Sequence, residues 1–199
     1  MSLRVRADDG TLRAWAPAAP PRALIFVKPS GRGPLDAARA RSAHAAIGGA
    51  LTFLGYESAD APSAGRGDLT MAVGAASPEA ADFAARGFSP EDFHYYCLKT
   101  HLRAPLAFSW EGLDSARADL EALRGAAQSL SGVTLEGSSR GVTGYLHRFR
   151  EALSRDFDFP EALSCVWDGL RPGALSPGSK AAFLRAALPA LGLENSLPG

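Results

Sequence analysis

The feature of the sequence that most constrains the fold is a short, continuous apolar run near the N-terminus. Residues 23–28, ALIFVK, lie between proline- and glycine-containing segments, which is typical of a strand buried on both faces of a parallel sheet. The loop PSGRG follows, and an alanine-rich segment then predicts a long helix from about Pro34 to Leu54 that ends at Gly55. A strand, a loop and a helix in this order form half of a βαβ unit, so this part of the chain is predicted to be α/β.

Shorter elements are predicted around this unit. Residues 3–6 and 11–15 flank the turn signal DDG and should form a hairpin, which the proline-rich connector APAAPPRA follows. Residues 58–67 are small, polar and proline-containing, so we expect a loop or a shortened connection there. Residues 68–73, DLTMAV, are the candidate second strand, and the sequence SPE begins a short predicted helix over residues 77–87.

The remainder of the chain is predicted to be helical. The sequence SPED at residues 89–92 supplies a capping serine and a first-turn proline for a helix that precedes a bend at residues 104–105. Apolar residues then recur at three- and four-residue spacing in four further segments: residues 109–131, 138–157, 160–170 and 177–188. Short connections favour antiparallel packing. We therefore predict an α/β domain over residues 1–88 and an antiparallel helical bundle over residues 89–199.

The composition excludes several classes of protein. With 46% hydrophobic and 21% charged residues, the chain should form a packed core rather than a disordered ensemble. The formal net charge is zero, so nucleic-acid binding would need a local basic patch. No run approaches the ~20 apolar residues of a membrane span, and the N-terminus lacks the apolar segment of a signal peptide. We therefore expect a cytoplasmic protein without membrane contact.

Two stretches of the helical part resemble a known family. Residues 86–113 read RGFSPEDFHYYCLKTHLRAPLAFSWEGL, and residues 154–170 read SRDFDFPEALSCVWDGL. They resemble the helical bundle, often called the DALR domain, of the cysteinyl-tRNA synthetases. That family shows a Gly-Tyr/Phe-Asp/Ser-Pro-Glu signature, then a segment similar to STHYRSPLNFSEEAL, and later DDFNTPEAL. The order and spacing also fit, so the resemblance implies a DALR-like bundle over residues 89–199.

The N-terminal part resembles the catalytic core of the same family less closely. Residues 54–57, LGYE, match the end of the helix that follows the family's HIGH motif, and counting back places PLDA, residues 34–37, at the HIGH position. The family's KMSKS loop would precede Phe88, yet the chain has no lysine between Lys28 and Lys99. The resemblance thus implies a reduced Rossmann-like (HUP-type) core that lacks both groups by which the family holds ATP phosphates.

The family also binds a zinc ion through a cysteine placed directly after the first strand. Here the strand ends in Val27-Lys28-Pro29, and the two cysteines, Cys97 and Cys165, both lie in the helical part. Their helical, apolar surroundings favour two reduced core thiols over a disulfide or a metal site. We expect no metal and no cofactor, with ATP as the less favoured exception.

Four residues are candidates for a nucleotide-binding remnant. Ser30, Gly31 and Gly33 lie in a loop beside a helix N-terminus, where backbone amides can hold a phosphate, although the loop matches neither GxGxxG nor a P-loop. His44 lies on the following helix, where it could face ATP. The alternatives are an ordinary turn for the loop and a surface or satisfied core histidine for His44.

The candidates for tRNA contact lie in the helical part. The resemblance places His101 and Arg103 near the tRNA-facing side of the bundle, and the alternative is a corner pinned by imidazole and guanidinium hydrogen bonds. The predicted helix over residues 138–157 is the most basic element, and bundle helices of the family face the inner bend of tRNA. Its candidates are Arg140, Arg148, Arg150 and Arg155. Against tRNA binding, residues 89–199 hold more acidic than basic residues.

These observations favour a truncated, catalytically inactive paralogue of the cysteinyl-tRNA synthetases that binds tRNA or another protein. The alternative is an ATP-dependent cysteinyl or aminoacyl ligase that keeps residual nucleotide binding and takes its basic residues from a partner chain. A degenerate product that folds without a selected role is a third interpretation. Apolar surface left by the missing insertion would favour a homo-oligomer.

Overall fold

The α/β part is built on a small parallel sheet. The computed structural model describes residues 3–7, 9–63, 66–74, 83–134 and 140–197. In the sheet, β3 (Arg22–Pro29) is central and pairs with β4 (Glu57–Asp60) on one side and with β5 (Leu69–Val73) on the other. The apolar run therefore forms the middle strand, as its continuous hydrophobicity predicts.

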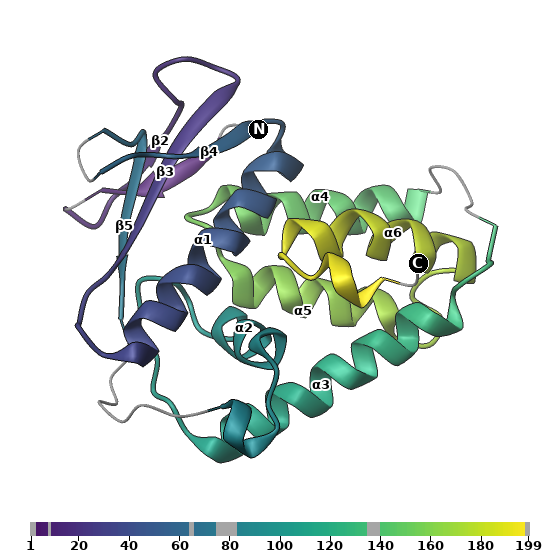
Figure 1. Ribbon diagram of the computed structural model, residues 1–199. Coiled ribbons are helices and arrows are strands. Elements are labelled where there is room, and N and C mark those ends of the chain that lie inside the picture. The colour runs from purple at the N-terminus through teal and green to yellow at the C-terminus, as the bar shows by residue number, and fades with distance from the viewer. Residues whose placement is uncertain (1–2, 8, 64–65, 75–82, 135–139, 198–199) are drawn as a thin grey trace.

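Helix α1 (Pro34–Leu54) covers one face of this sheet and separates it from the remaining helices (Figure 1). The helix has proline in its first turn, and Gly55 ends it with a φ of 96°, in the left-handed region that glycine adopts readily. Both predicted ends of the helix are confirmed.

A short hairpin at the N-terminus packs against the helical part. β1 (Arg4–Arg6) and β2 (Leu12–Ala14) pair in antiparallel fashion, which confirms the predicted hairpin. The hairpin docks on the helical part, because the amide of Asp156 donates to the carbonyl of Arg4 at 2.7 Å. Residue 4 also forms an isolated parallel bridge with Arg155.

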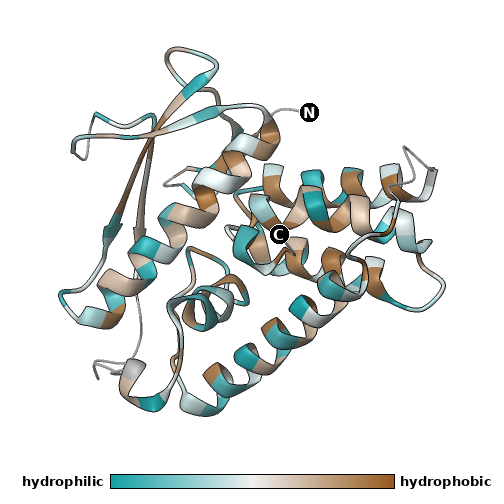
Figure 2. Cartoon of the chain, turned by 45° about the vertical axis from the view of Figure 1, so that its right-hand side comes forward, coloured by the Kyte–Doolittle hydropathy of each residue, from teal (hydrophilic) through white to brown (hydrophobic). Residues whose placement is uncertain are grey.

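The helical part follows the predicted order. After a 3-10 turn, η1 (Ala84–Arg86), the elements are α2 (Pro90–Leu98), α3 (Trp110–Ser129), α4 (Arg140–Ser154), α5 (Phe159–Leu170), α6 (Pro177–Ala190) and a second 3-10 turn, η2 (Glu194–Ser196). Hydrophobic and hydrophilic residues alternate along these helices, as expected for amphipathic elements (Figure 2). None of the described helices combines the length and apolar content of a membrane span.

One hydrophobic core joins the two parts. It runs from Ile25 of β3 through Ile47 of α1 to Phe149 of α4 and Leu188 of α6, all of which are buried. α1 packs against β3 with one face and against α2, α4 and α6 with others. The fold is thus an α/β part with a helical part, as the sequence predicts, while the domain boundary after residue 88 stays a prediction.

One predicted element was wrong. Residues 58–67 were expected to form a loop, but residues 57–60 form the edge strand β4. The sequence ESAD shows no apolar alternation because three of these four residues are exposed, and the strand is held by its backbone pairing with β3. The predicted helix over residues 77–87 lies mostly outside the described residues, which include η1 alone.

Candidate functional site

The carboxyl ends of β3 and β5 meet where the order of the strands reverses. Open α/β sheets usually bind their ligands at such a point. Here the loop after β3 closes onto β5, because the amide of Ser30 donates to the carbonyl of Val73 at 2.8 Å. The α-carbon of Gly74 then lies so close to Ser30 that an added β-carbon would collide with the serine hydroxyl. The two segments are in direct contact at this end of the sheet.

The N-terminus of α1 is capped by a carboxylate of the chain itself. Asp36 Oδ2 accepts a hydrogen bond from the amide of Gly33 at 3.2 Å, and a β-carbon on Gly31 would lie 2.5 Å from the same oxygen. A helix N-terminus attracts anions through its free amides and its dipole. The predicted phosphate loop, with Ser30, Gly31 and Gly33, therefore lies beside a carboxylate that already accepts the hydrogen bond of the Gly33 amide.

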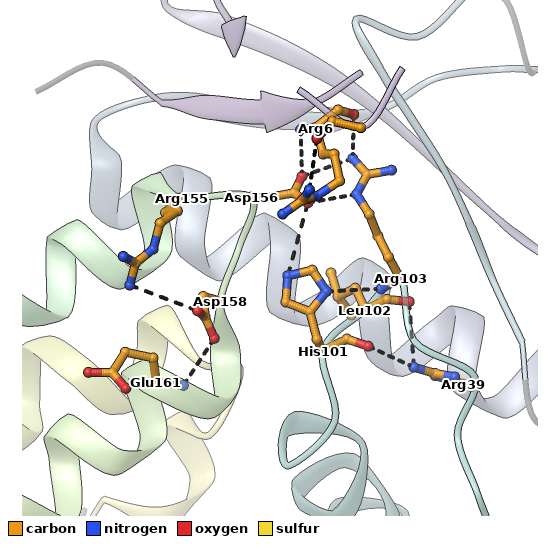
Figure 3. Close-up of polar contacts among 10 residues, drawn as sticks. Arg6, Arg39, His101, Leu102, Arg103, Arg155, Asp156, Asp158 and Glu161 are labelled. Carbon is orange, nitrogen blue, oxygen red and sulfur yellow. Dashed lines mark hydrogen bonds and ion pairs between the residues drawn. The ribbon is translucent and has the colours of Figure 1, made fainter. Parts of the chain in front are cut away.

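Arg39 of α1 is a buried cation at the same end of the sheet that sequence analysis missed. Its side chain is 1% exposed, and Nη1 donates to the carbonyl of Gly74. Nη2 donates to the carbonyl of Ala104 at 2.7 Å. It also donates to the carbonyl of His101 at 3.2 Å (Figure 3). Burial lowers the pKa of this guanidinium, and its Nε has no hydrogen-bond partner among the described residues. Arg39 thus ties α1 to the end of β5 and to the corner that follows α2.

The predicted corner residues are gathered around Asp156, whose side chain is 2% exposed (Figure 3). Arg103 donates to both carboxylate oxygens, with distances of 2.7 Å from Nε and 2.8 Å from Nη2. The amide of Arg6 adds a hydrogen bond of 2.9 Å, and His101 Nε2 lies 4.0 Å from the carboxylate. The buried Asp156 carboxylate therefore links the corner to the hairpin and to the turn before α5, through its bidentate hydrogen bonds with Arg103 and its hydrogen bond from Arg6.

The other predicted tRNA contacts do not form one site. Arg148 pairs with Asp168 at 3.1 Å, whereas Arg150 donates to the carbonyl of Phe53 at 3.2 Å and lies over that aromatic ring. Arg140 begins α4, but its side chain lies outside the described part. The basic residues of α4 therefore point to several neighbouring elements.

Because it forms a bridge with residue 4, the backbone of residue 155 instead lies beside the hairpin, whose arginines sequence analysis also missed. We call Arg4, Arg6, Arg103 and Arg155 the hairpin basic patch. The side chains of Arg6 and Arg155 are 48% and 47% exposed. Two carboxylates face these four arginines: that of Asp156 and that of Asp158, which lies 3.9 Å from Arg155. The patch is a local excess of positive charge on a chain of zero net charge.

On the other side of β3, two adjoining cavities lie between α1 and β4. They measure about 300 and 440 Å³ and share His44, Ala45 and Asp60 in their linings. His44 Nε2 is 2.8 Å from Asp60 Oδ1, so the predicted nucleotide residue His44 is separate from the loop at residues 30–33 and faces the end of β4.

His94 is a second histidine with a clear structural role. It is buried, its Nε2 lies 2.8 Å from the carbonyl of Leu191, and its Nδ1 lies 2.9 Å from the hydroxyl of Ser42. A carbonyl only accepts, so Nε2 carries the proton and the serine hydroxyl donates to Nδ1. Burial lowers the pKa of this histidine, which keeps a neutral ring between α1, α2 and the end of α6.

The cysteines are buried thiols. Cys97 and Cys165 are both free, and burial raises the pKa of Cys97 to about 12 and that of Cys165 to about 11. Such thiols are poor nucleophiles and poor metal ligands. Within the residues that the structure describes, no group of three or more His, Cys, Asp or Glu side chains is placed to hold a metal ion.

Comparison with known proteins finds cysteine–tRNA ligases of several bacteria. Cysteine–tRNA ligase of Treponema pallidum is 32% identical over 127 residues, covering 54% of this chain and 24% of that protein. The chain is cysteinyl-tRNA synthetase-like over about half of its length. The ligases of Methylococcus capsulatus and Pectobacterium carotovorum are each 37% identical, over 113 and 84 residues, which cover 53% and 42% of the chain. No family model matches. The matched part spans about a quarter or less of these synthetases.

Proposed function

We propose that this cysteinyl-tRNA synthetase-like protein is catalytically inactive and binds tRNA. The observation that carries the proposal is the contact between the ends of β3 and β5, where Ser30 lies against Gly74 and the Arg39 guanidinium donates to the Gly74 carbonyl. In this protein, side chains and backbone of the chain itself lie where open α/β sheets usually hold a ligand.

The charges at this point also oppose adenylation. Forming an aminoacyl adenylate gathers negative charge on the phosphates, so a catalyst needs cationic or amide donors directed at them. Here Asp36 places a carboxylate at the start of α1, and the cation of Arg39 is directed at backbone carbonyls. These contacts support a binding protein over the alternative of an ATP-dependent ligase.

The hairpin basic patch is the surface best suited to tRNA. Phosphate contacts from arginine dominate nucleic-acid affinity and do not require a particular base sequence. Arg6 and Arg155 are both about half exposed, and the bridge between residues 4 and 155 holds the two segments side by side. Arg103 is oriented by Asp156, which leaves the exposed arginines around it as the contacts we expect.

Fluorescence anisotropy with bulk tRNA and cysteine-specific tRNA over a salt series tests this proposal. We expect tight binding at low salt that weakens steeply, since each phosphate contact adds about 0.7 to 0.9 to the slope of log K against log salt. The triple variant Arg4→Glu, Arg6→Glu, Arg155→Glu should lose at least about tenfold in affinity and about 2 in slope. Arg185→Glu changes the charge of an exposed residue of α6 in the same way and serves as the control.

Two results would contradict the proposal. Equal binding by the triple variant and by the control would remove the hairpin basic patch as the site, and no binding at low salt would favour a protein partner instead. Cysteine-dependent exchange of pyrophosphate into ATP should stay at the level of a blank. Exchange above the blank would support the alternative function, an ATP-dependent ligase.

A further inference from the structure

We propose that the buried Asp156 carboxylate docks the N-terminal hairpin on the helical part and thereby assembles the hairpin basic patch. Asp156 is then a positioning residue, which acts through the arginines that it places. Removing its negative charge should weaken the binding of tRNA, whereas a purely electrostatic effect would strengthen it. The effect on binding rests on the proposed function, and the docking of the hairpin does not.

The contacts of Asp156 with the hairpin are the first argument (Figure 3). Its carboxylate accepts a hydrogen bond from the amide of Arg6 at 2.9 Å, and its own amide donates to the carbonyl of Arg4 at 2.7 Å. Arg103, which contacts both carboxylate oxygens, also donates from Nη2 to the carbonyl of Arg6 at 2.9 Å. Asp156 therefore binds β1 directly and also through its arginine partner.

Other parts of the hairpin are anchored separately. Leu3 is buried in the hydrophobic core, and the indole Nε1 of Trp15 donates to the carbonyl of Asp68 at 3.0 Å. Loss of the Asp156 carboxylate should therefore release the end of β1, which carries Arg6, while the two outer ends of the hairpin stay in place. The rest of the fold should remain intact.

The backbone conformation of Asp156 is the second argument. Asp156 and Phe157 have φ values of 56° and 55°, in the left-handed region that residues other than glycine rarely adopt. Such conformations persist where the surrounding contacts hold them, and they are concentrated at sites with a function. In this turn, the amide and the carboxylate of the same residue both bind β1. The unusual conformation thus serves the docking of the hairpin.

A neighbouring carboxylate separates positioning from charge. Asp156 and Asp158 both face the patch, and if charge alone mattered, removing either would raise the affinity for tRNA phosphates. The side chain of Asp158 contacts Arg155 and accepts a hydrogen bond from the amide of Glu161, both within its own turn. Asp156 instead contacts the hairpin, so neutralising the two residues should change the affinity in opposite directions.

Asp156→Asn and Asp158→Asn are therefore matched variants. Asparagine tolerates a left-handed φ at position 156, and at position 158 it caps the start of α5 as well as aspartate does. Hydrogen–deuterium exchange measures the docking. The amides of β1 should exchange at least about tenfold faster in Asp156→Asn and at the parent rate in Asp158→Asn. The amides of α1 and α6 should exchange as in the parent in both variants.

Fluorescence anisotropy with tRNA measures the consequence for binding. Asp156→Asn should bind at least about threefold more weakly than the parent and lose about 1 in the slope of log K against log salt, because Arg6 is no longer held. Asp158→Asn should bind as tightly as the parent or a few times more tightly. Arg103→Lys keeps the charge of the patch without the planar fork, so it should match Asp156→Asn in both measurements. It also replaces that variant if circular dichroism shows that Asp156→Asn does not fold.

Three outcomes would overturn parts of the inference. Unchanged exchange of β1 in Asp156→Asn and in Arg103→Lys would remove the docking role, whatever the affinity for tRNA. Faster exchange of β1 with undiminished binding of tRNA would remove the positioning role, since the patch would not need a docked hairpin. No binding of tRNA by the parent would contradict the proposed function and the effect on binding, whereas the exchange of β1 would still decide the docking role.

Discussion

The two sides of β3 differ although the same strand and helix form both. On the β5 side, Ser30 lies against Gly74, and Arg39 donates to the carbonyl of Gly74 directly after β5 and to carbonyls of the corner, so chain segments are in direct contact. On the β4 side, small residues of α1 and the exposed pair of His44 and Asp60 surround a cavity. The β5 side is thus the more closely packed side, although the family resemblance leads one to expect catalysis there.

The two buried charges near the corner show what this packing requires. Asp156 is matched by a guanidinium that contacts both of its oxygens, whereas the hydrogen-bond acceptors of Arg39 are neutral carbonyls. A buried charge whose hydrogen-bond acceptors are all neutral depends mainly on those hydrogen bonds. We call the β5 side of β3 the closed side and the β4 side the open side. Substitutions on the closed side should therefore lower the stability of the fold, whereas the open side should tolerate them.

The largest effect is expected from Arg39→Met. Methionine retains most of the apolar stem but removes the guanidinium hydrogen bonds to the carbonyls of Gly74, His101 and Ala104, at about 1 kcal/mol each. Removing a buried cation offsets part of that cost, so we expect a net loss of about 2 kcal/mol in the free energy of unfolding.

Urea denaturation measures this loss against a control. Arg41→Met makes the same change at an exposed position two residues later and should stay within about 0.5 kcal/mol of the parent. If Arg39→Met were as stable as the parent, the hydrogen bonds of Arg39 would not hold the closed side together.

The second largest effect is expected from Gly74→Ala. The added methyl group would collide with the Ser30 hydroxyl, so the exposed Ser30 side chain must rotate or shift, and we expect a loss of about 1 kcal/mol. Ser30→Ala removes the colliding oxygen, so the double variant should recover about half of the loss. Thermal unfolding of the two single variants and of the double variant measures this coupling. If the stability losses of the two single variants simply added in the double variant, the strain of Gly74→Ala would not arise from contact with the Ser30 hydroxyl.

The fold was largely predictable because its elements carry local signals. Pro34 and Gly55 mark both ends of α1, and Ser89 caps α2 through a hydrogen bond from the amide of Asp92 at 3.1 Å. β4 was missed because a short edge strand is held by its backbone and needs no apolar alternation. The local pattern of ESAD therefore could not reveal it.

The site residues were less predictable because their partners are distant in the sequence. Arg39 interacts with residues 35 to 65 positions away, and Arg6 with a residue 150 positions away. One signal was present: Arg39 occurs on a stripe with Leu35 and Ala43, both of which are buried. An arginine at such an apolar spacing indicates a buried cation.

The third prediction concerns pH and His94, which borders the open side next to Gly192. Burial lowers its pKa in the folded protein, so the unfolded chain takes up a proton first as the pH falls below about 6.5. The free energy of unfolding should therefore decrease between about pH 6.5 and 5, by about 1 kcal/mol. Amide hydrogen bonds from Leu24 and Ala18 lower the pKa of Asp68. Asp68 therefore affects the free energy of unfolding only below about pH 4, outside the range assigned to His94.

Urea denaturation at several pH values checks this expectation. His94→Gln should flatten the dependence in that range at some cost in stability, while His44→Gln, on the exposed pair with Asp60, should keep it. An unchanged slope in His94→Gln would assign the dependence to another group.

The smallest effect is expected on the open side. Ala37→Leu adds three carbons at a partly buried position of α1 that lines the cavity, where the new side chain meets space and apolar neighbours. Its free energy of unfolding should stay within about 0.5 kcal/mol of the parent, or rise slightly as apolar surface is covered. Gly74→Ala adds a single carbon and should cost more, which sets the two sides of β3 apart in one pair of measurements. If Ala37→Leu were as damaging as Gly74→Ala, the two sides of β3 would be equally packed.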